Sequence, residues 1–509
     1  MSHASQTTRP LQEYLDALHR EGILLSSPDA TSASLAIANA TDDSRDVRPQ
    51  TLFVCKGATF RREYLLDAIE AGAVAYVAEQ DFGVSIPAII VSDIRRALGI
   101  TADLAWNHPS EHIDICAITG TRGKTTTAYC LRAILQARAE RLGLPRCPLF
   151  STITLDDGIE VETSTLTTPE PFDLQRHIAN AVASGSSTLV MEASSQALKY
   201  GRMRGVELAV GAFTNISEDH ISPIEHPTFE DYFAGKLRLF EKARTAVVNL
   251  DMKPECRERV LSAASACERT ITCSTTEAEA DLRAVNIRHE RGGIAFELAA
   301  GPNVPELNEP LAVRLPMLGL YNAENALIAA ACALAVDATA ADIRAGLEAV
   351  HIPGRMEIVH QEDGLTVIVD YAHNGSSLEA LLTDVRDAYP NHEVTCVFGA
   401  TGTKGVERRY GMGEAAGRLA DRIIVTEDDP GKEDPALIAR EIERAVRETG
   451  ATNITTILDR REAARHAIEG VRRPAVVILA GKGHETFVVR GTERLPYEGD
   501  AAVIRSIVG

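Results

Sequence analysis

Residues 113–126 of this 509-residue chain read IDICAITGTRGKTT. A short apolar run, 113–118, leads into a glycine turn, and a helical pattern follows from Lys124 to Arg138. A strand, a glycine turn and a helix in this order form the setting that a phosphate-binding loop requires. Backbone N–H groups of such a turn converge on phosphate oxygens, and the N-terminus of the helix adds a favourable field. The stretch therefore predicts a nucleotide site where a buried strand ends.

Two side chains of this loop have the chemistry that phosphates and magnesium require. Lys124 is expected to reach the β and γ phosphates, and the hydroxyl of Thr125 to ligate magnesium. The loop is a short variant, because the longer consensus has glycine where this chain has Ile118. An ordinary glycine turn before a helix is the alternative, and the preceding strand disfavours it. The predicted nucleotide-binding residues are Gly120, Thr121, Arg122, Gly123, Lys124, Thr125 and Thr126.

Short apolar runs alternate with longer helical patterns over most of the chain, which predicts α/β architecture with parallel sheets. Strands are expected at 51–55, 73–77, 88–91, 188–192, 209–215, 246–250, 365–370, 394–399, 422–426 and 475–480. Further helices are expected at 64–72, 94–106, 322–335 and 341–350. Breaks near Pro109 and at Pro353-Gly354 predict three domains, 1–107, 108–350 and 351–509.

Composition excludes several classes of protein. Hydrophobic residues make up 45% and charged residues 24%, as in ordinary globular proteins. The 72 acidic and 52 basic residues give a net charge of -20, which disfavours nucleic acids and anionic membranes as partners. The polar residues 1–10 lack the apolar core of a signal peptide, so a cytoplasmic protein is expected. None of the nine cysteines forms a CxxC pair, so reduced buried thiols are favoured over zinc or disulfides.

Two further residues are candidates for holding a metal beside the loop. Glu192 ends a predicted strand, where a carboxylate points toward a site at the carboxyl ends of parallel strands. His220 follows another predicted strand, although magnesium prefers oxygen ligands. Each alone would be an ordinary surface or capping group. Together with the phosphate loop they predict a metal site.

Motifs in a fixed order extend over nearly the whole chain. They are TRGKTTT (121–127), TTPEP (167–171), MEASSQAL (191–198), NISEDHISPIEHPTFEDYFAGK (215–236), LYNAENA (320–326), PGRMEIV (353–359), DYAHN (370–374), FGATGTKG (398–405) and AGKGHE (480–485). In this order they resemble the Mur ligases. Residues 41–57, TDDSRDVRPQTLFVCKG, resemble the uridine-nucleotide-binding domain of the MurE branch, which adds the third residue of the peptidoglycan stem peptide.

The resemblance implies a three-domain architecture: an N-terminal UDP-sugar-binding α/β domain, a central P-loop ATPase domain with a mostly parallel sheet, and a C-terminal Rossmann-like domain. It also implies a reaction. ATP phosphorylates a carboxylate of UDP-N-acetylmuramoyl-L-alanyl-D-glutamate, and an incoming amine attacks the acyl phosphate. The implied cofactors are ATP and Mg²⁺, with Lys236 carbamylated, and the protein is expected to be a monomer. The implied catalytic residues are Lys124, Glu192, His220 and Lys236, and the implied metal-binding residues are Thr125, Glu192, His220 and Lys236.

Further contacts carry over from the family position by position. Ser44 and Arg45 are expected at the uridine nucleotide, and Thr167, Thr168, Ser194 and Arg202 at the muramyl-dipeptide. Asn322 and Asn325 fit the adenine side, and Arg355, Asp370 and His373 fit the nucleotide contacts of the C-terminal domain. Relatives often have glutamine two residues before the arginine. This chain has Tyr200 there, so it departs from the family pattern at that position.

The amino acid that is added depends on one loop. Arg409, Gly481 and Glu485 match positions that hold the ammonium and carboxylate of the incoming amino acid. The motif Asp-Asn-Pro-Arg of diaminopimelate-adding relatives stands here as Asp428-Asp429-Pro430-Gly431. Gly431 cannot pair with the second carboxylate of diaminopimelate, whereas the two aspartates suit the distal ammonium of L-lysine.

L-Lysine is therefore expected, with ornithine and meso-diaminopimelate as alternatives, because an ammonium pair alone resolves chain length poorly. Lys432 could instead bind a carboxylate, or the segment could be only an acidic solvated loop. Among other enzymes, folylpolyglutamate synthase shares the loop and the ligase chemistry, but it normally lacks the N-terminal domain. A regulatory P-loop switch would leave His220, Lys236, Arg409 and Glu485 without roles.

Overall fold

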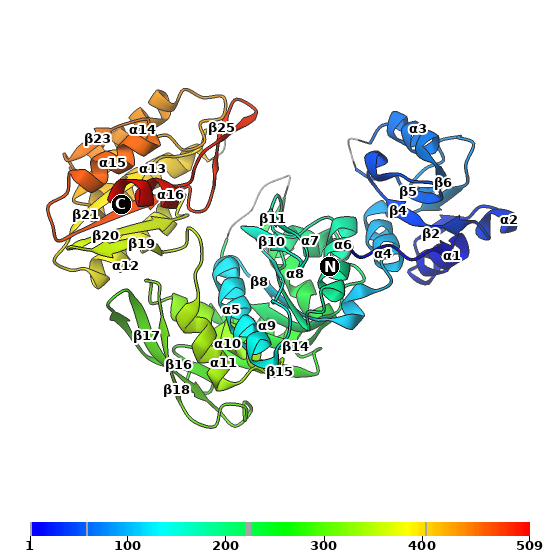
Figure 1. The fold of residues 1–509 in the computed structure, drawn as a ribbon, viewed down its shortest axis with the longest axis horizontal. Helices are drawn as coiled ribbons and strands as arrows, with labels where there is room; N and C mark the ends of the chain where they lie inside the picture. Colours follow the sequence, from blue (N-terminus) through cyan, green and yellow to red (C-terminus); the bar gives the residue numbers. More distant parts are fainter. Residues whose placement is uncertain (1–2, 58–59, 219–224, 403–404) are drawn as a thin grey trace. The chain divides into compact units, whose positions relative to one another are not determined.

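The computed structural model describes residues 3–57, 60–218, 225–402 and 405–509. The chain divides into two units. Figure 1 shows its helices and strands, coloured from the N-terminus to the C-terminus. The first contains Met1–Arg283, Ala299–Glu309 and Glu324–Gly346, and the second contains Ala284–Leu298, Pro310–Ala323 and Leu347–Gly509. None of the helices in the described residues combines the length and apolar character that crossing a bilayer requires.

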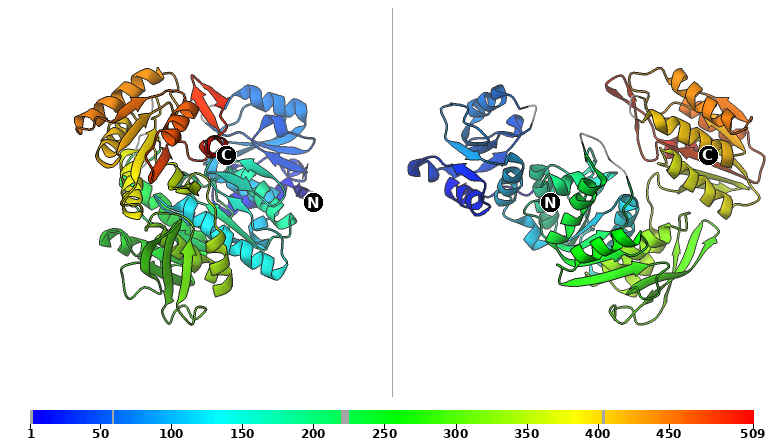
Figure 2. Two further views of the ribbon diagram at one scale, coloured as in Figure 1. Left: turned by 60° about the vertical axis from the view of Figure 1, so that its left-hand side comes forward. Right: turned by 180° about the vertical axis from the view of Figure 1, so that it is seen from behind.

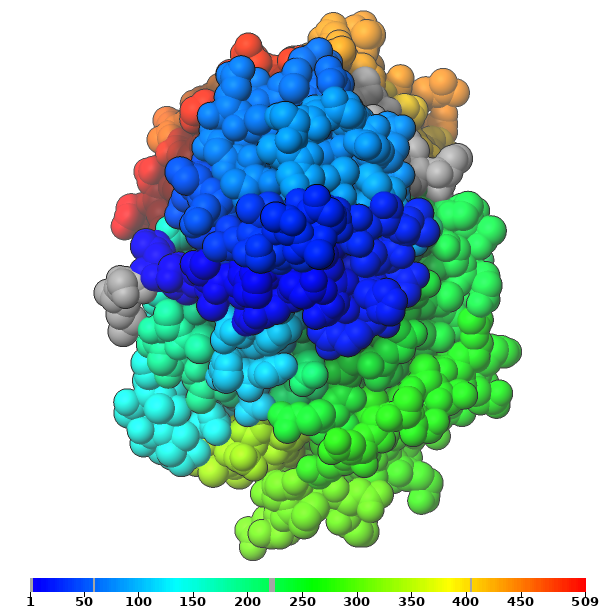
Figure 3. Space-filling view, turned by 90° about the vertical axis from the view of Figure 1, so that its right-hand side faces the viewer, coloured from blue at the N-terminus to red at the C-terminus, as the bar shows by residue number. Residues whose placement is uncertain are grey.

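The first unit begins with a small sheet of strand order β2-β7-β6-β5-β4. Its strands are β2 (Leu24–Ser26), β4 (Asn39–Thr41), β5 (Thr51–Val54), β6 (Ala73–Ala78) and β7 (Ala88–Val91), and only β2 is antiparallel to its neighbour. Alternate residues of a strand point to opposite faces. Accordingly Leu52 and Val54 pack with helices α1 (Leu11–Arg20) and α4 (Ile94–Ala105), while Phe53 packs with α3 (Arg62–Ala71). Figure 3 shows the outer surface of this region in blue.

A larger, mostly parallel sheet follows, and it positions the phosphate loop. The parallel strands of this sheet that lie wholly in the first unit are β9 (Leu149–Phe150), β12 (Thr188–Glu192), β8 (Asp114–Thr119), β13 (Leu208–Phe213), β14 (Ala243–Asn249) and β15 (Arg269–Ser274), in that spatial order. In the register of the central three, Glu192 pairs with Ile118, and Phe213 pairs with Thr119. The carboxyl ends of β8, β12 and β13 therefore meet at one edge, directly before α5 (Lys124–Leu142).

The remaining elements of the first unit surround this sheet. The strands β10 (Thr154–Asp156) and β11 (Val161–Thr163) extend the sheet beyond β9 as antiparallel strands. The helices are α6 (Pro171–Ala183), α7 (Ser195–Lys199), α8 (Phe229–Leu237), α9 (Pro254–Ala264) and most of α10 (Asn322–Leu334) and α11 (Ala340–Ala349). Helices α7 and α8 pack against each other. Ser194, a predicted dipeptide contact, immediately precedes α7, and Lys236, a predicted metal ligand, lies on α8. The packing of the two helices therefore positions these two predicted residues relative to each other.

The second unit contains a sheet of strand order β19-β20-β24-β21-β22-β23, parallel except for β19. The strands are β19 (Glu357–Glu362), β20 (Leu365–Asp370), β21 (Glu393–Phe398), β22 (Arg422–Val425), β23 (Ile454–Thr456) and β24 (Ala475–Ala480). Helices α12 (Gly375–Ala388), α13 (Val406–Leu419) and α14 (Pro435–Glu448) lie side by side, and α15 (Arg460–Glu469) and α16 (Asp500–Val508) cover the other face (Figure 2).

The predicted α/β class with a mostly parallel sheet is confirmed. Each predicted strand and helix overlaps one in the structure, with ends that differ by a few residues. The strands β16 (Leu282–Glu290), β17 (Gly293–Ala300) and β18 (Leu311–Leu315) are not among the predicted elements, nor is the hairpin of β25 (Phe487–Arg490) and β26 (Glu493–Pro496). In β18 buried and exposed residues alternate, so it lacks the continuous apolar run of the parallel strands. The three domain boundaries stay predictions.

A buried ion pair stabilises the C-terminal sheet near its carboxyl edge. Arg460 donates to both carboxylate oxygens of Asp500 at 2.7 and 2.6 Å, and to the carbonyl of Ala480 at 3.0 Å. Both side chains are buried. Removing one partner of such a pair leaves an uncompensated charge in the interior.

We expect Asp500→Asn to lower the free energy of unfolding of this unit by about 3–5 kcal/mol, measured by urea unfolding. The matched control is Arg490→Ala, which removes an equally bidentate pair with Glu427 whose arginine is exposed. An exposed pair contributes at most about 1 kcal/mol. Equal losses in the two variants would contradict the assignment of a stabilising role to burial at Arg460.

Candidate active site

The phosphate loop has the backbone that its glycines permit. Gly123 adopts φ 81°, and a Cβ there would lie 2.2 Å from Oδ1 of Asn325. Only glycine fits such a close approach in the left-handed region. Lys124 begins α5, and its Nζ donates to the carbonyl oxygens of Gly120 at 3.0 Å and Thr121 at 3.1 Å. The ammonium therefore already lies over the loop that would cradle phosphates.

The segment after β13 holds this loop in place. Thr214 donates its hydroxyl to the carbonyl of Arg122 at 2.7 Å, and the N–H of Arg122 donates to Oδ1 of Asn215 at 2.9 Å. The N–H of Thr121 donates to the carbonyl of Asn215 at 3.0 Å. Thr126, also predicted at the nucleotide, is buried at the start of α5. These bonds fix the loop through protein contacts alone, which is the preorganisation that anion binding needs.

The predicted metal ligand Glu192 lies directly beside the loop. Its fully buried carboxylate accepts from the hydroxyl of Thr125 at 3.1 Å and from the N–H of Thr152 at 2.8 Å. A carboxylate and a threonine hydroxyl supply the oxygen ligands that magnesium prefers, so these residues fit the implied ion. His220, predicted as a further ligand, lies outside the described residues.

Lys236 lies at the same carbonyl as Lys124. Its Nζ donates to Gly120 O at 2.7 Å and stands 4.6 Å from the centre of the Tyr232 ring, and the residue is only 1% exposed. Two ammonium groups thus converge on one peptide oxygen. A carbamate on Lys236 would reverse the sign of one of them and place an anion where a metal is expected.

The other predicted nucleotide residues make contacts within their own units. In the first unit, Asn325 accepts from the hydroxyl of Thr127 at 3.3 Å. In the second unit, Asn322 donates to Leu318 O at 2.6 Å, and Arg355 stacks 4.3 Å from the ring centre of Tyr371.

Asp370 and His373 flank Tyr371 in the same unit. The carboxylate of Asp370 accepts from the N–H groups of Met356 at 2.7 Å and Ala372 at 2.8 Å, and Nδ1 of His373 bonds to Tyr371 O at 2.8 Å. Burial raises the pKa of Asp370 and lowers that of His373. Burial thus disfavours the charged form of both groups, and the imidazole of His373 is uncharged at neutral pH.

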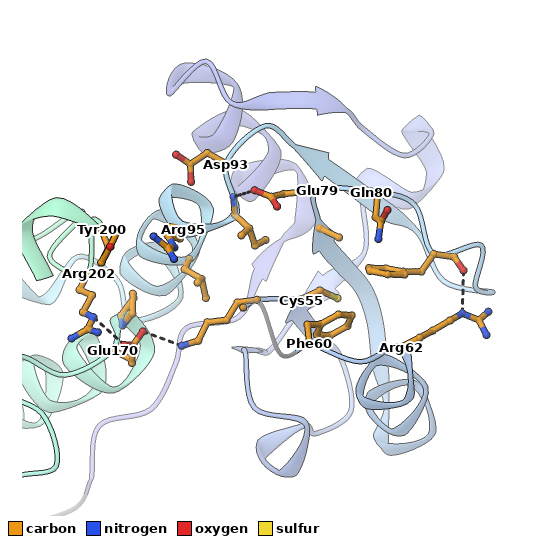
Figure 4. A pocket seen from close by; sticks show the side chains of 17 residues that line it. Cys55, Phe60, Arg62, Glu79, Gln80, Asp93, Arg95, Glu170, Tyr200 and Arg202 are labelled. Carbon is orange, nitrogen blue, oxygen red and sulfur yellow. Dashed lines mark hydrogen bonds and ion pairs between the residues drawn. The ribbon is translucent and has the colours of Figure 1, made fainter. Parts of the chain in front are cut away.

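A pocket of about 820 Å³ opens between the N-terminal sheet and the segments that carry Glu170 and Arg202 (Figure 4). The Nε of Arg202 lies 2.9 Å from Glu170, and Lys56 lies 3.1 Å from the same carboxylate. Lys56 also pairs with Asp42 at 2.5 Å. Arg202 is among the substrate contacts predicted from the sequence. Lys56 and Glu170 are not, although both lie within the quoted motifs. The pocket thus offers two cations held by carboxylates of the chain itself.

Tyr200, which stands where relatives have glutamine, lines the same pocket. The guanidinium of Arg95 stands 4.1 Å from its ring centre, a cation–π contact that joins the N-terminal sheet region to α7. Tyr200 is therefore occupied by a partner within the protein.

The remaining predicted substrate residues differ in accessibility. Arg45 is exposed and pairs with its neighbour Asp43, and Ser44 beside it is half-buried. Thr168 is fully buried, and its hydroxyl donates to Glu192 O at 2.9 Å and accepts from Ser194 N at 3.0 Å. Ser194 caps α7, and Thr167 accepts from the hydroxyl of Thr152 at 3.2 Å. The hydroxyl of Thr168 thus organises the backbone beside Glu192.

In the second unit, the predicted lysine-reading aspartates surround an internal lysine. Nζ of the fully buried Lys482 lies 2.5 Å from Asp429, 3.1 Å from Glu485 and 3.6 Å from Asp428. Burial opposes its charge, but the three carboxylates together raise the pKa of Lys482. Burial also raises the pKa values of Asp428 and Glu485. Three carboxylates therefore face one ammonium, and the cluster favours a further cation.

Sequence reasoning missed Lys482 because nothing in the motif AGKGHE shows which way its lysine points. Residues near Lys482 are also held by hydrogen bonds. The N–H of Gly481 donates to Asp370 O at 3.1 Å, and Pro430 is buried and accepts from Glu433 N at 3.0 Å. The loop 427–434 is therefore held by hydrogen bonds beside Lys482, although Lys432 on it is exposed.

Arg409 has the surroundings of a carboxylate-binding group. Its buried guanidinium donates to Glu441 at 2.7 Å and to Glu433 at 2.8 Å. Two carboxylates of the chain thus lie on the arginine that is predicted to hold the carboxylate of the incoming amino acid.

Gly431 has a constraint that the sequence did not reveal. It adopts φ 59°, its N–H donates to Val489 O at 3.0 Å, and its carbonyl accepts from Gly491 N at 2.6 Å. A residue with a side chain pays roughly 1–2 kcal/mol in this left-handed region. An arginine at this position is therefore opposed by the backbone.

The fold and this site define a P-loop nucleotide-binding protein of the α/β class. The Mur ligase middle domain matches residues 118–333, and the Mur ligase glutamate ligase domain matches residues 354–483. The chain belongs to the Mur ligase family, as its ordered motifs predict.

Individual relatives extend over the whole chain. A UDP-N-acetylmuramoyl-L-alanyl-D-glutamate–L-lysine ligase from Streptococcus suis is 38% identical over 480 residues, 94% of each chain. A ligase of the same name from Enterococcus faecalis is 35% identical over 517 aligned positions, 97% of each chain. Among solved structures, a UDP-N-acetylmuramoyl-L-alanyl-D-glutamate–2,6-diaminopimelate ligase matches with a TM-score of 0.69 and 26% identity, covering 99% of both chains.

The position of Lys236 leads to a test of its modification. We expect Lys236→Ala to lower ligase activity at least about a hundredfold, because removal of a preorganised charge at a phosphoryl-transfer site costs about that much. Short carboxylic acids should partly restore turnover by placing an anion in the space left at Gly120. Steady-state kinetics with and without acetate measure both effects, and undiminished ligation by the variant would rule out the carbamate.

Proposed function

We propose that this protein is an ATP-dependent ligase that joins L-lysine to UDP-N-acetylmuramoyl-L-alanyl-D-glutamate in peptidoglycan precursor synthesis. The observation that carries the proposal is the acidic cluster of Asp428, Asp429 and Glu485 beside Gly431. The relatives named as L-lysine ligases support the same choice.

Electrostatics favours lysine over diaminopimelate at this cluster. One buried ammonium, that of Lys482, faces three carboxylates, so a second ammonium from the substrate would be stabilised there. Diaminopimelate would bring an additional carboxylate, and position 431 has no side chain to pair with it. Ornithine stays the nearest alternative, since a shorter side chain carries the same charge.

The nucleotide half of the site supplies the activation step. A carboxylate oxygen of the substrate attacks the γ-phosphorus of ATP, and ADP leaves with the electron pair of the broken bond. Lys124 and the loop N–H groups would hold the phosphates, and Thr125, Glu192, His220 and a carbamylated Lys236 would hold magnesium. Magnesium, when bound, neutralises charge on the phosphates. Asn322, Asn325, Arg355, Asp370 and His373 are proposed to contact the rest of the nucleotide.

The second step forms the amide. The free amine of the amino acid attacks the acyl carbon, and the C–O bond to phosphate breaks. Inorganic phosphate leaves with the electron pair of that bond, and it takes up the proton that the nitrogen loses. Arg409, Gly481 and Glu485 are proposed to orient this amino acid, and Asp428, Asp429, Pro430 and Gly431 to shape the pocket for its side chain. The UDP-sugar is proposed to contact Ser44 and Arg45, and the dipeptide to contact Thr167, Thr168, Ser194 and Arg202.

The rival functions have less support. A folylpolyglutamate synthase-like ligase does not account for the N-terminal sheet of residues 24–91, which relatives named as L-lysine ligases match along with the rest of the chain. A P-loop switch does not account for the acidic cluster or for Arg409. The cytoplasm, where ATP is available, is the proposed location, and the monomeric state stays a prediction.

Product mass spectrometry with UDP-N-acetylmuramoyl-dipeptide, ATP and a panel of amino acids tests the proposal. We expect L-lysine to be used with a catalytic efficiency at least about a hundredfold above that of meso-diaminopimelate, because an uncompensated buried charge costs several kcal/mol. Asp429→Asn should weaken lysine use only modestly, since Asp428 and Glu485 remain. Equal efficiency for the two amino acids would overturn the proposal and favour Lys432 as a carboxylate partner.

Gly431→Arg tests the same pocket from the other side. The added guanidinium should narrow the preference for lysine, but the left-handed backbone limits the gain and should lower stability by about 1–2 kcal/mol. Gly431→Ala is the matched control, because it carries the backbone cost without the charge. A change in selectivity that is equal in both variants would show that backbone strain, rather than charge, controls the choice.

A further inference from the structure

A chain of polar contacts joins α7 to α8 in the first unit; Ser195 and His226 are buried in it, and Lys199 and Asp231 are half-buried. Ser195 Oγ lies 3.0 Å from Nε2 of His226, whose Nδ1 lies 2.7 Å from Oδ2 of Asp231. Lys199 donates to the same aspartate oxygen at 2.7 Å. The hydrogen bond from Lys199 holds the pKa of Asp231 below its usual value, so the carboxylate is charged. Ser195 and Lys199 belong to α7, and Asp231 belongs to α8, so the contacts fasten the two helices together.

Serine, histidine and aspartate in this order have the geometry of a hydrolase triad, but their setting favours a different role. His226 is fully buried and Ser195 is 7% exposed. The pocket of about 820 Å³ is lined by Tyr200 and Arg202 and not by Ser195. A nucleophile needs access to an acyl carbon, with reacting atoms about 3–3.5 Å apart. Among the described residues, Ser195 is enclosed by protein, so its role is structural rather than nucleophilic.

The same contacts continue to the phosphate loop through Tyr232. The rings of His226 and Tyr232 meet edge to face, with centroids 5.2 Å apart. The hydroxyl of Tyr232 donates to Thr121 Oγ1 at 3.2 Å, and Nζ of Lys236 stands 4.6 Å from the centre of the Tyr232 ring. Tyr232 therefore contacts the loop with its hydroxyl and the buried lysine with its face.

We propose that His226 and Tyr232 are positioning residues that hold Lys236 and the phosphate loop in register with the α7 segment. The inference rests on the proposed function, because it assigns these residues a purpose in nucleotide binding and phosphoryl transfer. Ser194 and Arg202, the proposed dipeptide contacts, flank α7, while Thr121 and Lys236 belong to the nucleotide half. The polar chain thus ties the two substrate sites to one rigid element.

The chain offers a matched control. His177 and Asp157 form a second buried pair in the same unit, with Nδ1 and Oδ2 also 2.7 Å apart and both side chains at most 1% exposed. Asn180 donates to the same oxygen at 2.8 Å. This pair lies on α6 and the loop after β10, and none of its hydrogen bonds involves the phosphate loop or Lys236. Loss of its histidine should therefore cost stability without disturbing the nucleotide site.

The experiment compares His226→Asn, Tyr232→Phe and His177→Asn by calorimetry with Mg²⁺ and ADP, by steady-state ligation and by thermal unfolding. We expect His226→Asn to weaken Mg·ADP binding at least about fivefold and to lower kcat at least about tenfold. The KM for the amino acid should stay within about twofold in each variant. Tyr232→Phe, which keeps the ring, should show a smaller loss of about threefold in Mg·ADP affinity, the value of one hydrogen bond.

His177→Asn should lower the melting temperature as much as His226→Asn and leave Mg·ADP affinity and kcat unchanged. The inference is overturned if His226→Asn and Tyr232→Phe bind Mg·ADP like the unmodified protein, or if His177→Asn weakens binding equally. If His226→Asn fails to fold, Tyr232→Phe still decides the matter. Failure of the proposed function has a separate signature, because the unmodified protein would then bind Mg·ADP without forming any ligation product.

Discussion

The carbonyl oxygen of Gly120 accepts hydrogen bonds from two ammonium groups, those of the half-buried Lys124 and the buried Lys236. This arrangement requires the ends of three parallel strands to meet, because the loop follows β8, Glu192 ends β12 and the anchoring residues follow β13. Positive charge concentrated on one peptide group is costly in a dry interior. It becomes useful when phosphates arrive, since their charge is then met by groups already in place.

The second unit concentrates negative charge, where the phosphate loop concentrates positive charge. Its cluster of three carboxylates is stabilised by one internal ammonium, that of Lys482, and Arg409 is stabilised by two internal carboxylates. In the proposed function, the carboxylate cluster would bind an ammonium of the amino acid and Arg409 would bind its carboxylate. Each of these groups already pairs with a residue that has the same charge as the substrate group it would bind. Selectivity then depends on which additional charge the site tolerates, and a neutral, left-handed Gly431 offers nothing to a second carboxylate.

Much of this could be predicted from the sequence, because the decisive patterns are local. The strand, glycine turn and helix around Lys124 lie within a few residues of one another, and apolar runs show parallel strands directly. Contacts between distant residues could not be predicted in this way. Lys482 and Asp429 are 53 positions apart, and Lys56 and Glu170 are 114 apart. The left-handed φ angle of Gly431 could not be predicted either, because a glycine is compatible with many backbone conformations.

The most direct test of the account follows one oxygen atom. If the substrate carboxylate is phosphorylated before the amine attacks, then UDP-N-acetylmuramoyl-L-alanyl-D-glutamate labelled with ¹⁸O in the carboxylates of its glutamate should pass one ¹⁸O to inorganic phosphate. Mass spectrometry of the phosphate formed with ATP and L-lysine measures this transfer. Phosphate that carries one labelled oxygen for each amide formed is the predicted result. Unlabelled phosphate would contradict the account, because it would mean that ATP is cleaved by water without formation of an acyl phosphate.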